Sequence, residues 1–281
     1  MRAIVNHSLA KEDSEHMERV EQLFEQLWQD YIQRLCPSAA QVHDLLTEEE
    51  PLLNDHIALR TFNLPMVGLD RLAAPFIALG YKPCGRYHFE AKKLYAEHFE
   101  HPNPLAPKVF ISELMVGQFS SLLQQTVRDL VEQVPEQAMH DPAFLYGGRL
   151  WDLDYATYEL LAAESEYAGW LAAHGFGANH FTVSLNQLEQ FTEVAEVNHL
   201  LRHNGFEINS SGGEVKGSPE VMLEQSSTMA DRVEVGFTDG VYTIPGGFYE
   251  FAKRYPKEDG ELYSGFVEAS ADKIFESTDV N

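Results

Sequence analysis

Two strand-like segments far apart in the sequence each begin with a polar residue followed by histidine. No other feature restricts the possible folds as strongly. The segments are 54–62 (NDHIALRTF) and 178–186 (ANHFTVSLN). Side chains on a strand alternate between faces, so His180, Thr182 and Ser184 share a polar face opposite an apolar one. Such a strand fits the wall of a wet cavity. Two segments of this kind would fit a fold of paired β-modules in which each module contributes one histidine.

Charge narrows the range of binding partners. The 281 residues include 44 acids and 20 bases, which gives a formal net charge of −24. Nucleic acids and anionic membranes need a basic surface, so neither is expected as a partner. An anionic ligand would need a local group of Arg or Lys side chains to overcome the acidic field.

The first residues contain no long apolar run, so we expect no secretory signal. No apolar stretch approaches the roughly 18 residues of a membrane span. With only two cysteines, Cys36 and Cys84, a disulfide framework is not expected. These features predict a cytoplasmic protein, and the sequence does not predict its oligomeric state.

Apolar periodicity predicts a mixture of helices and strands. Helices are expected over 14–35, 69–79, 118–134 and 158–173 and up to about residue 203, and strands over 107–116 and 178–186. From 205 to 255 the pattern predicts β-structure, with a hairpin turn at 238–240 (TDG). No Gly-Ser or Pro-rich linker divides the chain. We therefore expect one α+β catalytic domain over 1–281, made of a helical segment (1–50), a metal-binding β core with helical insertions (51–255) and an acidic tail with a short helix (256–281).

A third segment, 244–255 (IPGGFYEFAKRY), completes a candidate metal site. If it is extended beyond the glycines, Glu250 lies between aromatic neighbours, where a carboxylate is costly to bury unless it is paired or binds a metal. His56, His180 and Glu250 would then form two imidazoles and one carboxylate, the facial triad of non-haem Fe(II) oxygenases. The alternative is that each histidine is a hydrogen-bonded core residue.

Basic side chains near this site are candidates for binding an anionic substrate. Arg60 shares a strand face with His56, and its guanidinium suits a bidentate contact with a carboxylate. Arg254 follows Glu250 on the same predicted face. The alternatives are that Arg60 pairs with a buried acid and that Lys92 and Lys93 form a solvated face.

Other polar residues give weaker indications. Ser226, in the segment QSST, could offer a hydroxyl to a ligand or form a turn. His98 and His101 could form a metal pair if they were helical, although the following prolines favour a turn. The sequence contains no nucleophile elbow, P-loop or dinucleotide fingerprint, so those enzyme classes lack support.

Several blocks together resemble the 2-oxoadipate dioxygenase/decarboxylase family. They are NDHIALRTF, KKLYAEHFEHPNPLAPKVFISEL, ESEYAGWLAAHGFGANHFTVSLN, LEQSSTMADRVEVGF and GGFYEFAKRY, which span most of residues 54–255. The resemblance implies a fold like that of the vicinal oxygen chelate group, with a mixed or antiparallel β-sheet curved around a metal site and additional helices.

The resemblance also implies chemistry. The family's metal ligands fall on His56, His180 and Glu250, and its substrate-binding arginine falls on Arg60. The implied reaction converts 2-oxoadipate and O2 to 2-hydroxyglutarate and CO2 with Fe(II) as cofactor. The 2-oxo acid serves as its own reductant. Arg60 would orient the substrate, with Ser226 and Arg254 as further substrate contacts.

Two alternatives to this reaction stay open, the first suggested by the fold group that the resemblance implies. One is a glyoxalase-like isomerase or hydrolase that uses Zn or Ni, and the other is a non-catalytic metal-binding protein. Imidazole and carboxylate ligands suit Fe, Mn and Zn alike, so the sequence does not rank these metals.

Overall fold

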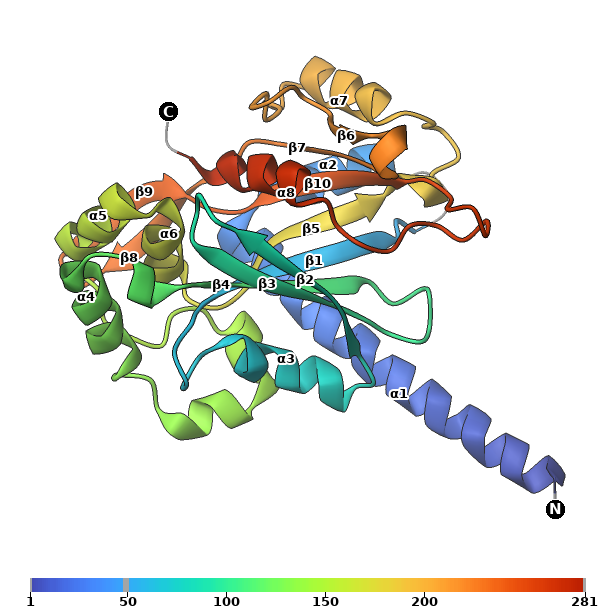
Figure 1. Ribbon diagram of the computed structural model, residues 1–281, viewed down its shortest axis with the longest axis horizontal. Coiled ribbons are helices and arrows are strands. Elements are labelled where there is room, and N and C mark those ends of the chain that lie inside the picture. The colour runs from blue at the N-terminus through green and yellow to red at the C-terminus, as the bar shows by residue number, and fades with distance from the viewer. Residues whose placement is uncertain (1, 48–50, 280–281) are drawn as a thin grey trace.

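A single curved sheet of eight strands forms the centre of the molecule (Figure 1). The computed structural model describes residues 2–47 and 51–279. The strand order is β2-β3-β4-β1-β5-β10-β7-β6. The strands are β1 (Asn54–Phe62), β2 (Lys82–Phe89), β3 (Leu94–Glu100), β4 (Lys108–Leu114), β5 (Ala178–Ser184), β6 (Lys216–Ser218), β7 (Leu223–Ser227) and β10 (Phe248–Arg254).

The sheet consists of two halves with the same strand order. In the first half β1 pairs in parallel with β4, and antiparallel β3 and β2 follow outward. In the second half β5 pairs in parallel with β10, and antiparallel β7 and β6 follow outward. Strands β1 and β5 join the halves as antiparallel neighbours. The predicted α+β fold of paired β-modules is confirmed.

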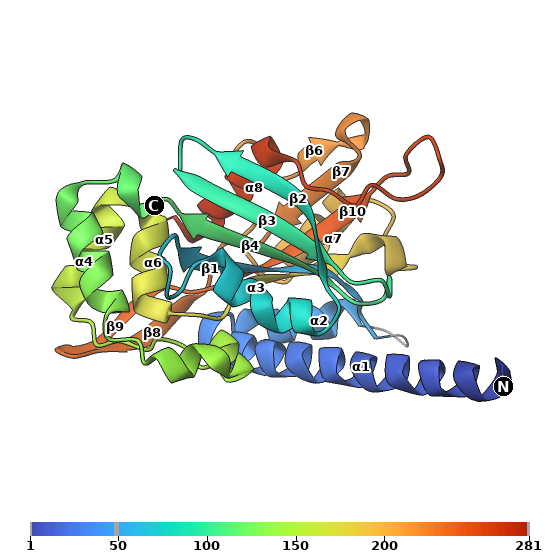
Figure 2. The ribbon, with the colours of Figure 1, turned by 60° about the horizontal axis from the view of Figure 1, so that its bottom comes forward.

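Helices cover the convex face of the sheet (Figure 2). Helix α1 (Arg2–Asp30) continues into a π-helical turn (Tyr31–Leu35), and α2 (Ser38–Leu46), α3 (Leu69–Ala78) and α7 (Val194–His203) complete the layer. The apolar stripe of α1 explains this packing. Trp28 and Tyr31 contact the ring of Phe181 on β5 at centroid distances of 5.1 and 5.0 Å. Burying these aromatic rings is a large favourable contribution.

A second group of helices lies beside the sheet with a separate hairpin. It contains α4 (Ser121–Val131), α5 (Tyr155–Glu164), α6 (Glu166–His174) and the hairpin β8 (Arg232–Phe237) and β9 (Gly240–Pro245). The predicted turn at 238–240 is confirmed, because the two strands pair on either side of it. The single helix expected over 158–173 is two helices, since Ser165 leaves the helical conformation and caps α6 through its hydroxyl.

The concave face is covered by the C-terminal residues. Helix α8 (Glu268–Phe275) and a 3-10 turn (Glu276–Thr278) lie across this face. The expected short helix is confirmed by α8, whereas the residues directly after it, expected as a loose tail, are packed. Ile274 and Phe275 are buried against the sheet, and Ser277 and Thr278 are fully covered.

Strands β2 and β3 were not predicted, and β2 lies at one edge of the sheet. Most side chains of β2 are exposed, so this segment lacks the alternation of apolar residues that identifies a half-buried strand. Within the described residues, 2–47 and 51–279, no helix is both long enough and apolar enough to cross a membrane.

Candidate metal centre

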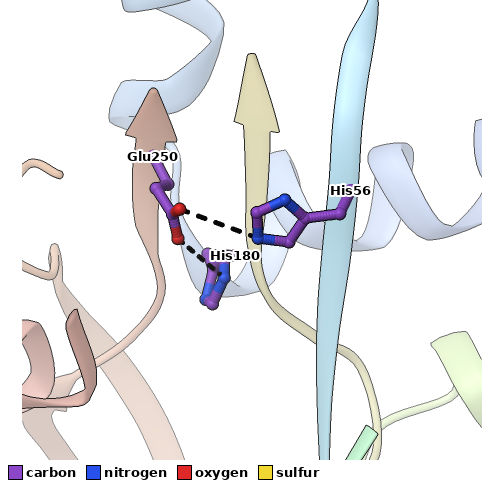
Figure 3. A group of neighbouring side chains, drawn as sticks. All are labelled: His56, His180 and Glu250. Carbon is purple, nitrogen blue, oxygen red and sulfur yellow. Dashed lines mark ion pairs between the residues drawn. The ribbon is translucent and has the colours of Figure 1, made fainter. Parts of the chain in front are cut away.

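Three potential metal ligands meet on the concave face, where β1, β5 and β10 are neighbours (Figure 3). His56 and Glu250 are each aligned with Thr182 of β5, one from either side. His180 precedes Thr182 by two residues and so points to the same face. All three ligand side chains are buried. The sequence-predicted triad is thus brought together in space.

The spacing of the ligand atoms fits a single ion. The Nε2 atom of His180 lies 3.0 Å from Oε2 of Glu250, and Nε2 of His56 lies 3.7 Å from Oε1. Figure 3 shows both imidazoles directed at the carboxylate. Nitrogen and oxygen ligands bind such metals at about 2.0–2.2 Å, which places adjacent ligands about 3 Å apart. The three side chains could therefore hold one metal ion with small adjustments.

Each imidazole is oriented by the polar residue that precedes it. His56 Nδ1 lies 2.7 Å from Oδ1 of Asp55, and His180 Nδ1 lies 3.0 Å from Oδ1 of Asn179. These oxygen acceptors place the proton on Nδ1 and leave the Nε2 lone pair for a metal. Metal-binding histidines commonly have such partners, which fix the tautomer and the ring orientation.

Arg254 supports this arrangement through Asp55. Its Nε and Nη2 donate to the two carboxylate oxygens at 2.7 and 2.8 Å, and Nη1 donates to the carbonyls of Tyr263 and Gly265. Burial would raise the pKa of Asp55, but the Arg254 charge and the His56 hydrogen bond outweigh it and hold this pKa well below its usual value. Every guanidinium nitrogen is engaged, so the predicted role of Arg254 in substrate binding is not supported. We assign it to positioning.

Glu250 is a fully buried carboxylate without a lysine or arginine partner among the described side chains. Gln225 Nε2 donates to its Oε1 at 2.5 Å, whereas Oε2 has no hydrogen-bond donor within residues 2–47 and 51–279. Burial raises the pKa of Glu250, but His56, His180 and Gln225 lower it by more, so it is ionised. Burial lowers the pKa of His180, which favours the neutral imidazole. A neutral nitrogen and an unsatisfied carboxylate oxygen facing each other fit a bound cation.

A small, mostly apolar cavity adjoins the triad. Its volume is about 20 Å³. Beside the three ligands its walls are Phe110, Gln225, Phe266, Ala271, Ile274 and Phe275. Phe266 packs edge-on against His56 with a centroid distance of 4.7 Å, and Phe248 stacks on His180 at 4.5 Å. This surrounding excludes bulk water from the site.

Arg60 lies further along β1 and is also buried. Its guanidinium carbon lies 4.9 Å from the ring centroids of both Tyr167 and Trp170. Nη2 donates to the Thr278 hydroxyl at 3.1 Å, and Nη1 lies 3.4 Å from a carboxylate oxygen of Glu166. Nε has no partner in the described part of the chain. This cation is only weakly compensated, as expected for a residue that binds an anion.

Other predicted substrate contacts lie elsewhere. Ser226 faces the opposite side of the sheet, where its hydroxyl donates to Asn198 of α7 at 2.6 Å, so its predicted role is withdrawn. Gln225 and Ser227 occupy the concave side instead, because residues on β7 alternate. Lys92 lies 3.9 Å from Asp272, and Lys93 donates to the Gln118 carbonyl, so both are away from the triad.

The predicted helical pair His98 and His101 is wrong. His98 lies on β3, and His101 Nε2 instead contacts the carbonyl of Leu79. His98 does come near Cys84 and Glu100, a grouping that sequence spacing did not indicate. Tyr87 and Glu100 already engage both of its ring nitrogens, at 2.8 and 2.9 Å. We therefore interpret His98 as a structural hydrogen-bonding residue.

Sequence reasoning missed the residues that support the triad. The signal for Asp55 and Asn179 was present, since each precedes a ligand histidine in a matching strand. Gln225 could have been found only with the register between β7 and β10, in which Gln225 is aligned with Ala252.

Comparison with known proteins gives a consistent result. A family model described as 2-oxoadipate dioxygenase/decarboxylase matches residues 7–261. The chain is 37% identical over 257 residues to the chloroplastic 2-oxoadipate dioxygenase/decarboxylase of Arabidopsis thaliana, covering 82% of this chain and 69% of that protein.

Two solved structures share the fold. Hydroxyglutarate synthase from Oryza sativa in complex with 2-oxoadipate is 31% identical, with a TM-score of 0.83, over 92% of this chain and 91% of that one. A protein of Shewanella frigidimarina described as a candidate hydrolase is 58% identical, with a TM-score of 0.86, over 89% of this chain and 98% of that one.

Proposed function

The chain belongs to the 2-oxoadipate dioxygenase/decarboxylase family, and on that premise we propose that it converts 2-oxoadipate and O2 to 2-hydroxyglutarate and CO2. Fe(II) would be held by His56, His180 and Glu250. The observation that carries this proposal is the buried triad facing a cavity that is otherwise mostly apolar. Two imidazoles and one carboxylate on one side of a metal are typical of non-haem Fe(II) oxygenases.

Iron bound in this way would supply open positions for a 2-oxo acid and O2 together with the electrons that activate O2. The chain's own residues prepare the site for that chemistry. Asp55 and Asn179 keep the proton of each histidine on Nδ1, so both Nε2 lone pairs face the centre. Gln225 holds one oxygen of Glu250 and leaves the other for the metal. Phe110 and Phe266 exclude water that would compete with the substrate.

We assign Arg60 to the carboxylate of the substrate that is remote from the metal. Arg60 and His56 face the same side of β1, and four residues of strand span about 13 Å between their Cα atoms. Arg60 has one long carboxylate contact, 3.4 Å to Glu166, and its Nε has no partner in the described part of the chain, so it gains a charge-assisted hydrogen bond when a dianionic 2-oxo acid binds. This contact would also position the substrate, the catalytic contribution proposed for Arg60.

The description of the Shewanella frigidimarina relative makes hydrolysis the second activity to test. Family membership favours the dioxygenase, and oxygen consumption separates the two because hydrolysis uses no O2. We keep the proposal of one catalytic domain over residues 1–281, which includes the N-terminal helical segment. The cytoplasmic location stays a prediction, and the relative from Arabidopsis thaliana is named as chloroplastic.

The test is O2 uptake and CO2 release by protein loaded with Fe(II) under anaerobic conditions and then mixed with oxygenated substrate. The substrates are 2-oxoadipate, the shorter 2-oxoglutarate, and 2-oxohexanoate, which has the same length but lacks the second carboxylate. We expect equal amounts of O2 and CO2 with 2-oxoadipate and none with His180→Ala. Absence of uptake with every acid, despite confirmed iron binding, would refute the dioxygenase proposal.

Arg60 is tested in the same assay. Arg60→Met should raise KM for 2-oxoadipate about 10- to 100-fold and leave that for 2-oxohexanoate nearly unchanged, because only the first has a carboxylate to lose. Glu166→Gln is the matched control, since it removes the long contact to Arg60 while keeping the guanidinium. An equal loss with both acids would assign Arg60 to folding instead.

A further inference from the structure

The cavity beside the triad is too small for the substrate of the proposed function, on which this inference rests. A volume of about 20 Å³ has room for about one water molecule. A six-carbon dicarboxylate spans roughly 6 Å between its terminal carbons and cannot enter this space. Some part of the wall must therefore move before substrate binds.

The movable part of the wall is the C-terminal covering, which we call the cap and define as residues 268–278. Its Ala271, Ile274 and Phe275 form one side of the cavity, whereas most of the remaining wall belongs to the central sheet. Sheet strands are held by ladders of backbone hydrogen bonds on both sides. A short terminal helix can separate from the sheet at a much lower cost.

Phe275 occupies a decisive position in the cap. Its ring lies in the wall of the cavity and also 5.7 Å from the guanidinium carbon of Arg60. The same residue lines a surface cavity of about 240 Å³, beside Phe119. The Phe275 ring thus separates both the triad and Arg60 from the surface cavity. The surface cavity is lined by two lysines and three carboxylates, so it offers space for entry without strong electrostatic attraction.

The cap is closed by a set of polar contacts. Asn209 Nδ2 donates to the Lys273 carbonyl at 3.0 Å and to the Ser277 hydroxyl at 2.8 Å. The hydroxyls of Ser227 and Ser277 are 2.8 Å apart, and the Thr278 hydroxyl accepts from Arg60. Neutral hydrogen bonds contribute little net free energy each, so these contacts can open and reform.

We propose that Phe275 is the gate of the active site and that the cap must lift before a 2-oxo dicarboxylate can contact the triad and Arg60 together. Thr278 then gives up its place on Arg60 to the substrate carboxylate. A carboxylate is a stronger acceptor than a hydroxyl, so binding of the substrate itself favours the opened cap. An acid without the second carboxylate lacks this advantage, which makes the cap a contributor to specificity.

The cap can be locked with a disulfide. The variant Ser227→Cys/Ser277→Cys, in a Cys84→Ser background, places two thiols where the hydroxyls are in contact. The protein is loaded with Ni(II), which allows binding without turnover, and the disulfide is formed and verified by mass spectrometry. Two rates are then compared between oxidised and reduced protein: removal of the metal by EDTA and association of 2-oxoadipate.

We expect both rates to fall about tenfold or more on oxidation and to recover with reductant, because only the opened state is accessible. Equal rates in the locked and reduced forms would overturn the proposal. Removal of the metal does not depend on the identity of the substrate. If 2-oxoadipate binds to neither form but the disulfide still slows removal of the metal by EDTA, the proposed function is refuted and the gating role of the cap is supported.

A second variant tests the gate without a disulfide. Phe275→Ala should speed the removal of Ni(II) by EDTA several-fold, since the ring that closes the cavity is gone. Phe119→Ala is the matched control, because Phe119 lines the surface cavity but not the inner one. Equal acceleration by both variants, or by neither, would contradict the role assigned to Phe275.

Discussion

Replacing Asp55 with asparagine tests the support beneath the proposed metal centre. The carboxylate accepts three hydrogen bonds, from His56 Nδ1 at 2.7 Å and from Arg254 Nε and Nη2 at 2.7 and 2.8 Å. An amide keeps the shape but loses the charge, and its NH2 group meets at least one donor. Breaking a buried ion pair on one side costs about 3–5 kcal/mol. Arg254 keeps two carbonyl partners, so we expect a value near the lower limit, about 3 kcal/mol.

The effect on metal binding is a separate quantity. Without the carboxylate, the His56 tautomer and ring orientation are no longer fixed, and loss of such a partner typically weakens metal affinity about 10- to 100-fold. Urea unfolding of the metal-free protein measures the loss of stability, and competition for Co(II) measures the loss of metal affinity. Asp259→Asn is the control, because it breaks an exposed pair with Lys257 that contributes little to stability. An Asp55→Asn variant as stable as this control, with unchanged Co(II) affinity, would refute the assignment of Asp55 and Arg254.

Three further substitutions test other features. Glu250→Gln should abolish metal binding, because it removes the carboxylate ligand of the triad; unchanged Co(II) affinity would contradict this. Burial lowers the pKa of His174 to about 3, so the unfolded chain binds the extra proton first as pH falls. Stability should drop by about 1.4 kcal/mol per pH unit from about pH 6 toward pH 3, and His174→Gln should flatten this slope in acid titrations of unfolding. Gly246→Ala would place Cβ 2.2 Å from the Leu35 carbonyl oxygen and should cost about 3 kcal/mol in thermal unfolding, whereas Gly117→Ala, in open space, should cost little.

The central strands were predictable because their chemistry is local. In β5 every second residue is polar, and the head of the strand repeats the pattern of β1, so the faces of His56 and His180 follow from alternation alone. The edge strand β2 was not predictable in this way, because its exposed and charged side chains resemble those of a loop.

Contacts between distant segments account for the remaining differences. Arg254 was placed on the correct face, but its partner Asp55 lies 199 positions away and sequence gives no distance between them. Ser226 was proposed for its hydroxyl, but the face of β7 on which it lies depends on the pairing of β7 with β10. The packing of the cap was not predicted because its acidic composition conceals Ile274 and Phe275, whose burial appears only once the sheet has curved beneath them.

The repeated strand order of the two half-sheets has a consequence for the coordination chemistry. Glu250 is aligned with Thr182, two residues after His180, and Phe110 of β4 is aligned with Ala58, two residues after His56. Phe110 and Glu250 therefore occupy equivalent positions in the two half-sheets. The benzyl group of Phe110, at the position equivalent to Glu250, breaks that symmetry. A metal held by His56, His180 and Glu250 would have no ligand from β4, so Phe110 would border the space open to small molecules.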